Sequence, residues 1–290
     1  MTAMLKIVLP LGLAFIMFSL GLGLRVADFR RVLARPGVIA LGLLAQTVLL
    51  PLTAFGLATA LALPPEAAVG LMILAACPGG VTAGMVTRLA RGETALSISL
   101  TALTSLLAFV TVPLIVGGSM AHFLGAEASV RLPVGQAVGG LFLITLLPVS
   151  LGLWLGERGR LGAPTTATVH RVATAVFIAI VLFTFTSQWP AMAQHAPQVG
   201  PAAILLNLLT MATGAALGWV VRLPAGGRVA LAMECSMQNS ALGITLAVSL
   251  LAAPELAVPS VIYAFLMNVT AFAMIALRRM RVQALDAPPA

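Results

Sequence analysis

The sequence predicts an all-α integral membrane protein of about nine transmembrane helices, built as an inverted repeat with two crossing discontinuous helices. The 290-residue chain is 60% hydrophobic and only 8% charged, with a mean hydropathy of +1.09. A soluble domain carries about 25% charged residues. The apolar runs are about 20 residues long, which is the length of a membrane-spanning helix. The basic residues lie between these runs and alternate from one side to the other.

The same composition excludes several other classes of protein. A disordered chain needs few apolar residues and many charges, and an outer-membrane barrel is built from alternating stretches of about 10 residues. The net charge of +8 does not indicate nucleic-acid binding, because the arginines stand in short groups between apolar runs. Cys77 and Cys235 lie inside apolar segments, so no disulfide framework is expected. The expected partners are the lipid bilayer and a small molecule, with no nucleic acid.

Nine apolar runs are separated by polar or turn-forming residues, and we expect each of them to cross the membrane. Most contain about 18–23 residues, enough for about 30 Å of hydrocarbon. The first run is long for a signal peptide and no A-x-A cleavage site follows it, so we interpret it as a span. The runs are 5–24, 38–60, 67–87, 96–116, 134–156, 172–189, 202–220, 230–250 and 259–277.

The basic residues predict the orientation of these spans. Fourteen of the sixteen Lys and Arg residues follow the first, third, fifth, seventh or ninth run, and only Lys6 and Arg131 lie on the other side. Basic loops remain in the cytoplasm. We therefore expect a multi-pass protein of the inner (plasma) membrane with its N-terminus outside and its C-terminus in the cytoplasm.

The spacing of the runs indicates an internal duplication. The midpoints of runs six to nine follow those of runs one to four by about 162–165 residues. The two copies are displaced by five spans, an odd number, so they would be inverted in the membrane. We expect one transmembrane domain over residues 1–290, with a first repeat at 5–116 and a second at 134–277. Inverted repeats around a central site are typical of secondary transporters.

Two spans in equivalent positions of the repeats are interrupted. Residues 77–84 of the third span read Cys-Pro-Gly-Gly-Val-Thr-Ala-Gly, and residues 234–240 of the eighth read Glu-Cys-Ser-Met-Gln-Asn-Ser. Proline removes a helical N–H and glycine loosens the backbone. A simple kink is the alternative interpretation of the first segment. A matched pair of interrupted spans, however, indicates the binding site of a transporter.

Glu234 is the only acidic residue that falls within a predicted span. A charge in the membrane costs at least about 2.5–3.5 kcal/mol and usually marks an ion or proton path. The alternative is a glutamate near a loop that reaches the interface, since Arg228 is six residues away.

Other oxygen-bearing side chains fall at similar or greater depth when the rise of a helix is counted from the nearest arginine. Carboxylate, hydroxyl and amide oxygens are the ligands that a hard cation needs. The alternatives are hydroxyls bonded to their own helix and amides that link neighbouring helices. These side chains are Ser97 and Thr101 in the inner half of the membrane, and Gln46, Gln238, Asn239 and Asn268 near its midplane.

These motifs resemble those of the bile acid:sodium symporter family, from the first span to the ninth. Bacterial members of that family typically have ten spans, of which this chain lacks the first. The resemblance implies a core domain of spans 38–116 and 202–277 and a panel domain of spans 5–24 and 134–189. It is carried by Gln46, Cys77-Pro78-Gly79-Gly80, Leu89-Ala90-Arg91-Gly92, Ala95-Leu96-Ser97, Glu234, Met237-Gln238-Asn239-Ser240 and Asn268.

The resemblance also implies which residues bind ligands. One sodium site would use the side chains of Glu234, Gln46 and Gln238 with the carbonyls of Cys235 and Met237. Residues of a second sodium site would be Ser97, Thr101 and Glu234. A Ser-Asn pair of that second site is replaced here by Ala83-Gly84, so the number of sodium ions, one or two, stays open. The residues implied around the substrate are Thr82, Asn239, Asn268 and Gly80.

The implied function is secondary active transport of small or amphipathic organic anions, bile-salt-like or pantoate-like carboxylates, coupled to sodium by alternating access, and not catalysis. A proton-coupled carrier is one alternative. Another is an exporter of related fold, of the arsenite or auxin type, in which Cys77 and Cys235 could offer thiolates. A receptor is not supported by any appended domain, and a hydrolase is excluded because His122, His170 and His195 fall at loops or span ends. Transport direction and oligomeric state stay open.

Overall fold

The computed structural model describes residues 3–27, 35–80, 82–125, 134–159, 162–187 and 189–286. Every element named in these residues is helical, and the model contains no strand there beyond one isolated pair of bridged residues. Six of the described helices are long and apolar enough to cross a membrane. The predicted fold class, an all-α membrane protein, is confirmed.

Five long helices and two rods with a π-helical turn account for most of the chain. The long helices are α1 (Ala3–Leu22), α7 (Thr94–Phe123), α10 (Ala163–Ser187), α11 (Trp189–Val220) and α14 (Val258–Asp286), the last preceded by the 3-10 turn η4 (Pro254–Ala257). One rod with a π turn comprises α3 (Pro36–Leu44), η1 (Ala45–Leu49) and α4 (Leu50–Ala60). The other comprises α8 (Val134–Leu141), η2 (Phe142–Leu146) and α9 (Leu147–Glu157).

Proline explains the π turns of these two rods. Pro51 and Pro148 each lie just after the wider turn. A proline ring clashes with the carbonyl four residues earlier in a regular helix, and a π turn gives that carbonyl room.

The remaining two rods are broken in the middle, at the interruptions that the sequence predicts. The first consists of α5 (Pro65–Ala76) and α6 (Ala83–Leu89). The second consists of α12 (Ala225–Ser236) and α13 (Ser240–Thr245), which continues into the π turn η3 (Leu246–Leu250). Between the halves, Cys77 and Met237 are in extended conformations, so the backbone leaves the helix at both places.

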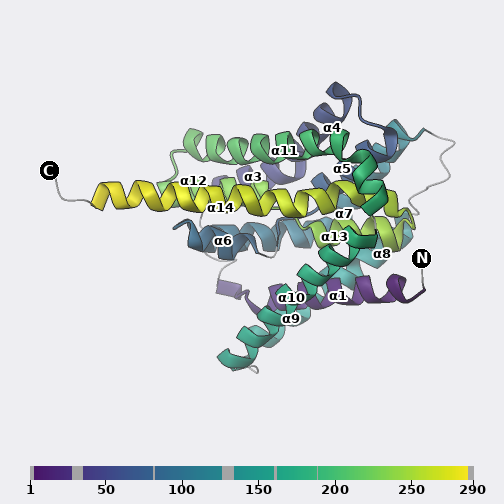
Figure 1. The fold of residues 1–290 in the computed structure, drawn as a ribbon. Coiled ribbons are helices and arrows are strands. Elements are labelled where there is room, and N and C mark those ends of the chain that lie inside the picture. Colours follow the sequence, from purple (N-terminus) through teal and green to yellow (C-terminus); the bar gives the residue numbers. More distant parts are fainter. Residues whose placement is uncertain are drawn as a thin grey trace.

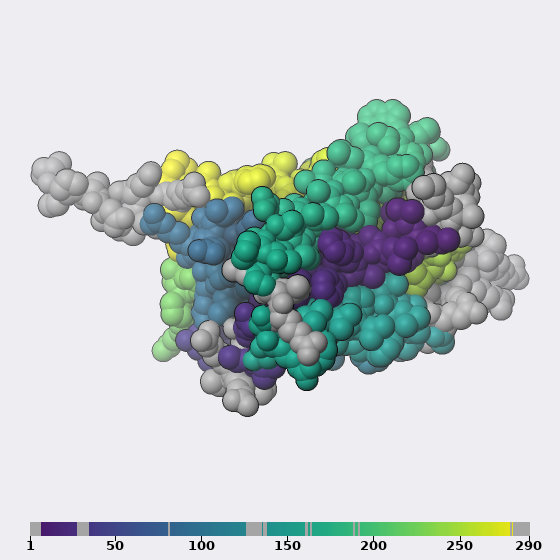
Figure 2. Space-filling view, turned by 90° about the horizontal axis from the view of Figure 1, so that it is seen from below, coloured from purple at the N-terminus to yellow at the C-terminus, as the bar shows by residue number. Residues whose placement is uncertain are grey.

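The helices form two groups. In Figure 1, α1 lies along the bottom with α9 and α10 packed on it, α10 running obliquely across it, whereas α11 and α14 run side by side above. Figure 2 shows α1, in purple, on the surface of the first group, between α10 and the segment α8–α9. The N- and C-terminal ends lie at opposite ends of the molecule (Figure 1).

The main apolar core surrounds the first broken rod. All residues of α5 from Ala67 to Ala76 are buried, and α5 packs against α4, α7 and α14. Non-helical backbone is tolerated at membrane depth only where protein or water, not lipid, surrounds it. The enclosure of α5 therefore allows the chain to break after Ala76.

Four helices extend well beyond the predicted spans, and one of them is α14, which continues from the predicted run 259–277 to Asp286. The sequence predicts runs at 96–116, 172–189 and 202–220, but α7 ends at Phe123, α10 begins at Ala163 and α11 begins at Trp189. Polar residues that limit an apolar run do not end a helix when their hydroxyls bond within it. Thr168 and Thr184 of α10 donate to the carbonyls of Pro164 and Ile180, at 2.9 and 2.8 Å.

Candidate ion and substrate site

The two breaks cross and pair with each other. Gly79 and Gln238 form an antiparallel bridge. The amide of Gly80 donates to the carbonyl of Met237 at 2.7 Å, and the amide of Asn239 donates to the carbonyl of Pro78 at 2.9 Å. The backbone groups of each break have no partner in their own helix, and the other break provides one. This pairing avoids the free-energy cost of unpaired backbone groups in the protein interior.

Close packing at this crossing requires a glycine at position 79. A Cβ atom built there would lie 2.1 Å from Oε1 of Glu234 and 3.2 Å from Oγ1 of Thr101. The φ angle of Gly79 is not positive, so the glycine is required for space rather than for backbone conformation. The first break therefore presses directly against the predicted ion-binding carboxylate.

Glu234 is fully buried in the last turn of α12. Its carboxylate accepts hydrogen bonds from Oγ of Ser97 at 2.6 Å and from Oγ1 of Thr101 at 2.5 Å. Both hydroxyls are buried on α7 and lie one helical turn apart. Glu234 forms no ion pair within the described part of the chain. A buried carboxylate with two hydroxyl donors and no basic partner can be ionised only with a mobile cation beside it, and otherwise takes up a proton.

Two buried glutamine oxygens of this region have no partner. Gln46 lies in the π turn η1 with its amide beside Glu234, but the geometry falls short of a hydrogen bond, and its oxygen has no partner within the described residues. Gln238 donates from Nε2 to the carbonyl of Cys235 at 3.0 Å, and its Oε1 is unpartnered. Buried polar atoms are nearly always satisfied in proteins. One carboxylate and two free amide oxygens fit a hard cation such as sodium.

The predicted second set of cation ligands is incomplete. Ser97 and Thr101 contact Glu234, but Ala83 and Gly84 offer no side-chain oxygen. A Cβ atom at Gly84 would lie 2.7 Å from Cγ1 of Ile98, so an isoleucine fills the space beside it.

Two residues that the sequence analysis did not single out hold the second break. Asn207 of α11 and Tyr263 of α14 both donate to the carbonyl of Ser236, at 2.9 and 2.7 Å. Ser236 is the last residue of α12, so its carbonyl has no continuing helix to bond. The sequence contained one signal, the position of Asn207 inside an apolar run. That position does not reveal that the amide donates to the carbonyl of Ser236.

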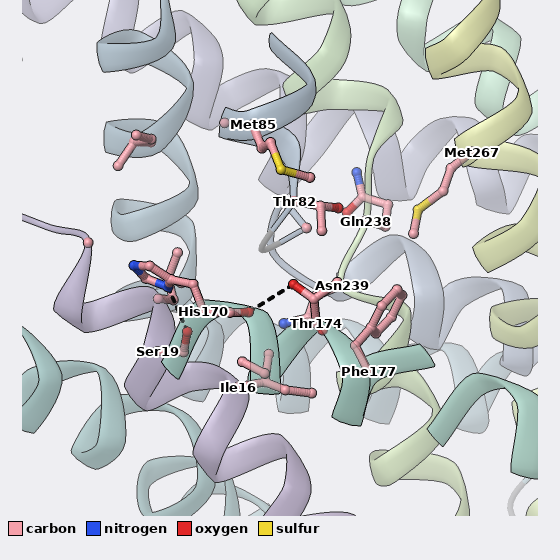
Figure 3. A pocket seen from close by; sticks show the side chains of 16 residues that line it. Ile16, Ser19, Thr82, Met85, His170, Thr174, Phe177, Gln238, Asn239 and Met267 are labelled. Carbon is pink, nitrogen blue, oxygen red and sulfur yellow. Dashed lines mark hydrogen bonds between the residues drawn. The ribbon is translucent and has the colours of Figure 1, made fainter. Parts of the chain in front are cut away.

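A cavity of about 290 Å³ lies between the crossing of the two breaks and the helix group that contains α1 and α10 (Figure 3). One wall comes from α1 and α10 and the other from the two breaks, α6, α7 and α14. Its apolar lining includes Ile16, Leu20, Ile98, Phe177 and Met267. Its polar lining consists of Ser19, Thr82, His170, Thr174, Gln238 and Asn239.

Of the predicted substrate residues, Thr82, Asn239 and Gly80 line this cavity. The side-chain oxygen of Asn239 caps α13 by accepting from the amide of Leu242 at 3.1 Å, and its nitrogen makes only a 3.9 Å contact with the sulfur of Met17. The amide nitrogen is therefore the part that can bind a ligand. Asn268 is not among the lining residues: its nitrogen donates to the carbonyl of Ala264, and Met267 lines the cavity instead.

The cysteines provide no support for a soft-metal site. Cys77 and Cys235 are both buried, and the thiol of Cys77 donates to the carbonyl of Ile73. The described residues contain no group of three or more His, Cys, Asp or Glu side chains that could hold a metal ion.

Comparison with known proteins finds one family of membrane transporters. The Sodium Bile acid symporter family model matches residues 10–194. The chain is 32% identical over 261 residues to the Uncharacterized sodium-dependent transporter YocS of Bacillus subtilis (strain 168), covering 89% of this chain and 78% of that protein. It is 30% identical over 258 residues to the Probable sodium/metabolite cotransporter BASS2, chloroplastic, of Oryza sativa subsp. japonica, covering 87% of this chain but only 59% of the rice protein.

A human protein is also similar. The chain is 26% identical over 246 residues to the Ileal sodium/bile acid cotransporter of Homo sapiens, covering 85% of this chain and 70% of that protein. These relatives are named as transporters or cotransporters, not as enzymes. The family match covers more than half of the chain, and the resemblance found in the sequence is confirmed: the chain belongs to the Sodium Bile acid symporter family.

Proposed function

We propose that this protein is a secondary active transporter that carries a small organic anion across the plasma membrane together with sodium. The observation that carries the proposal is the position of Gln238, which lines the cavity and also has a buried, unpartnered oxygen one turn beyond Glu234. An ion bound by this glutamine and an anion bound in the cavity would share one segment of backbone. Such sharing couples the two binding events.

In this proposal sodium binds to the carboxylate of Glu234 and to the side-chain oxygens of Gln46 and Gln238, with backbone carbonyls of Cys235 and Met237 completing the shell. The support is chemical: the site offers one full negative charge and free oxygens, and sodium is a hard cation. Ser97 and Thr101 orient the carboxylate through their hydrogen bonds.

We propose nine spans in an inverted repeat, with the N-terminus outside. The two broken rods support the repeat, because they pair at Gly79 and Gln238 through their own interruptions. Termini at opposite ends of the molecule, as in Figure 1, are expected for an odd number of crossings. In that topology α1, α8–α9 and α10 form the panel, the other helices form the core, and the cavity between them opens and closes as the two move by alternating access.

The cavity lies toward the cytoplasmic side in this topology. Gly23, Met85 and His170 line it, and they stand two, three and one residue before Arg25, Arg88 and Arg171 respectively. These arginines belong to the basic, cytoplasmic side of the chain. The conformation described here is therefore the inward-facing one.

We expect the dependence of uptake on sodium concentration to have a Hill coefficient of about 1, the value for a single coupled ion. The reason is the loss of two side-chain ligands at Ala83 and Gly84 and the filling of that space by Ile98. Initial rates in proteoliposomes at fixed substrate would give the coefficient. A value clearly above 1 would show that other oxygens complete a second site. The change of Ala83 and Gly84 to Ser and Asn should restore a second ion only when Ile98→Ala is made as well.

Replacing Asn239 should weaken substrate binding. Asn239→Leu removes a buried donor, worth about 1–3 kcal/mol, so the dissociation constant should rise about 5- to 150-fold. Because Leu also removes the cap of α13, Asn239→Asp is the matched variant: it keeps the capping oxygen and loses the donor. Calorimetry at saturating sodium would measure both. Wild-type affinity in both variants would place the substrate elsewhere.

A thermal-shift screen tests the function as a whole. Purified protein is heated with small carboxylates or bile salts, in sodium and in potassium at equal ionic strength. We expect stabilisation by an organic anion that is larger in sodium, because a ligand of the folded state stabilises it by mass action. Anion binding that is identical in both salts, with a strengthening at low pH that Glu234→Gln removes, would favour proton coupling at Glu234. No stabilisation by any organic anion in either salt would contradict the proposal.

A further inference from the structure

The walls of the cavity carry very little charge for a site that would hold an anion. No Lys or Arg is among the described residues that line it, and His170 is the one lining side chain that can take up a positive charge near neutral pH. His170 lies on α10, about two turns after its start, in the wall opposite Thr82, Gln238 and Asn239. Figure 3 shows its ring beside Ser19, with Asn239 and Thr82 across the pocket.

The imidazole of His170 is held in place through one nitrogen. Its Nδ1 lies 2.8 Å from the hydroxyl oxygen of Ser19, which is only 1% exposed on α1. Unlike Thr47 and Thr53, which donate to the carbonyl four residues earlier, Ser19 makes no hydrogen bond to its own helix in the described structure. The arrangement in which Ser19 donates to Nδ1 leaves the proton of the neutral ring on Nε2.

The other edge of the ring is open toward the cavity. Nε2 has no hydrogen-bond partner in the described structure. Gly23 lies on that side: a Cβ atom built there would lie 3.7 Å from Nε2. Gly23 also lines the cavity, so the smallest residue leaves the N–H edge of the imidazole accessible.

No charged group competes for this histidine among its described neighbours. Of the helices that pack on α10, α1 presents Ser19, α13 has no titratable side chain, α14 presents Met267 at the cavity, and α11 contributes no lining residue. Arg25, two residues after Gly23, donates to the carbonyl of Gly156. On α10 itself, Arg171 donates to Thr168. An anion that enters the cavity would therefore be the charge partner that His170 lacks.

The volume of the cavity limits the size of that anion. About 290 Å³ lies at the lower end of the volumes of small-molecule sites, about 300–1,000 Å³. A short branched carboxylic acid fits within this space, whereas a steroid acid would extend beyond it. The apolar side chains of Ile16, Phe177 and Met267 suit an aliphatic body, whereas the polar groups on both walls suit a single charged end.

We propose that His170, oriented by Ser19, is the anion-recognition residue of this cavity and binds the carboxylate of a small aliphatic acid through Nε2. This inference rests on the proposed transport function and assigns its substrate class. In the complex His170 takes up a proton, so that an imidazolium faces the carboxylate and the substrate binds with proton uptake.

The test measures binding of 4-methyl-2-oxopentanoate to the purified full-length protein at saturating sodium, with 4-methylpentanamide as the uncharged compound and cholate as the large acid. Wild-type affinity for the small acid should rise about tenfold from about pH 8 to about pH 6, because burial lowers the pKa of His170 in the free protein and a bound carboxylate raises it again. The small acid itself stays ionised throughout. The amide should bind at least about tenfold more weakly, and cholate should not compete.

His170→Gln is the critical variant, because it keeps an N–H donor but cannot become charged. Its affinity should match wild type at pH 8 and stay flat down to pH 6. Ser19→Ala should shift the pH profile without removing it. The matched control is His122→Gln, whose ring packs on Phe55 and Phe123 away from the cavity. It should keep the wild-type profile.

The outcomes separate this inference from the proposed function. A full pH dependence in His170→Gln, or tight binding of cholate with no binding of the small acid, would overturn the role of His170 or the size limit while sodium-dependent transport stands. Equal binding of acid and amide by the wild type would also overturn it. Absence of any sodium effect on the wild type would instead contradict the proposed function.

Discussion

Replacing Glu234 with glutamine should abolish sodium-dependent uptake and leave a folded protein. The glutamine keeps the shape of the side chain and a hydrogen-bonding oxygen for Ser97 or Thr101, but it removes the only charge at the crossing of the breaks. Loss of one partner of a buried charge pair costs about 3–5 kcal/mol, so sodium affinity should fall more than about 100-fold. Uptake in proteoliposomes and sodium-induced thermal stabilisation measure the two effects.

The variant also allows a check on folding. Without sodium, Glu234→Gln should be at least as stable as wild type, because a buried carboxylate without a basic partner is itself destabilising. Glu255→Gln is the matched control: Glu255 is exposed in η4, and its loss should change neither uptake nor the sodium effect. Near-normal sodium-dependent uptake by Glu234→Gln would exclude this carboxylate as the ion ligand.

The membrane class and the two interruptions could be predicted from the sequence because both depend on local composition. Long apolar runs are a one-dimensional signal, and Pro78 with Gly79 and Gly80 marks a helix break wherever it occurs. The second break contains no proline, and its run of polar residues at the equivalent position of the repeat indicated it. The helix ends were less predictable, because hydroxyls such as that of Thr184 bond inside their own helix and the helix continues past them.

The ion-binding residues were predictable in part for a similar reason. Depth counted from the arginines placed Ser97 and Thr101 level with Glu234, and the structure brings these three side chains together. Depth does not specify which faces of the helices meet. The contact between Ser19 and His170 joins residues 151 positions apart, and the contact between Gly84 and Ile98 depends on the rotation of two helices. Neither could be derived from helical periodicity.

Replacing Gly79 with alanine should have an effect nearly as large as the loss of Glu234, although Gly79 has no polar side chain. The new Cβ atom would lie 2.1 Å from Oε1 and 3.0 Å from Cδ of Glu234, so the carboxylate must leave its position. Its hydrogen bonds with Ser97 and Thr101 would then be lost or distorted. We expect sodium affinity to fall at least about tenfold, and overpacking to destabilise the protein by about 1–3 kcal/mol.

The cause of this effect can be isolated with two further proteins. Gly56→Ala, at a helical glycine with nothing within 4 Å of the new methyl group, should leave sodium binding and melting temperature nearly unchanged. Glu234→Asp shortens the side chain by one methylene and draws the carboxylate away from position 79. If the clash is with this carboxylate, Gly79→Ala should lower the melting temperature much less in the Glu234→Asp background than in wild type, a non-additivity expected of residues in direct contact. Strictly additive melting shifts would show that the alanine acts elsewhere, and the close approach of the first break to Glu234 would no longer explain the need for glycine.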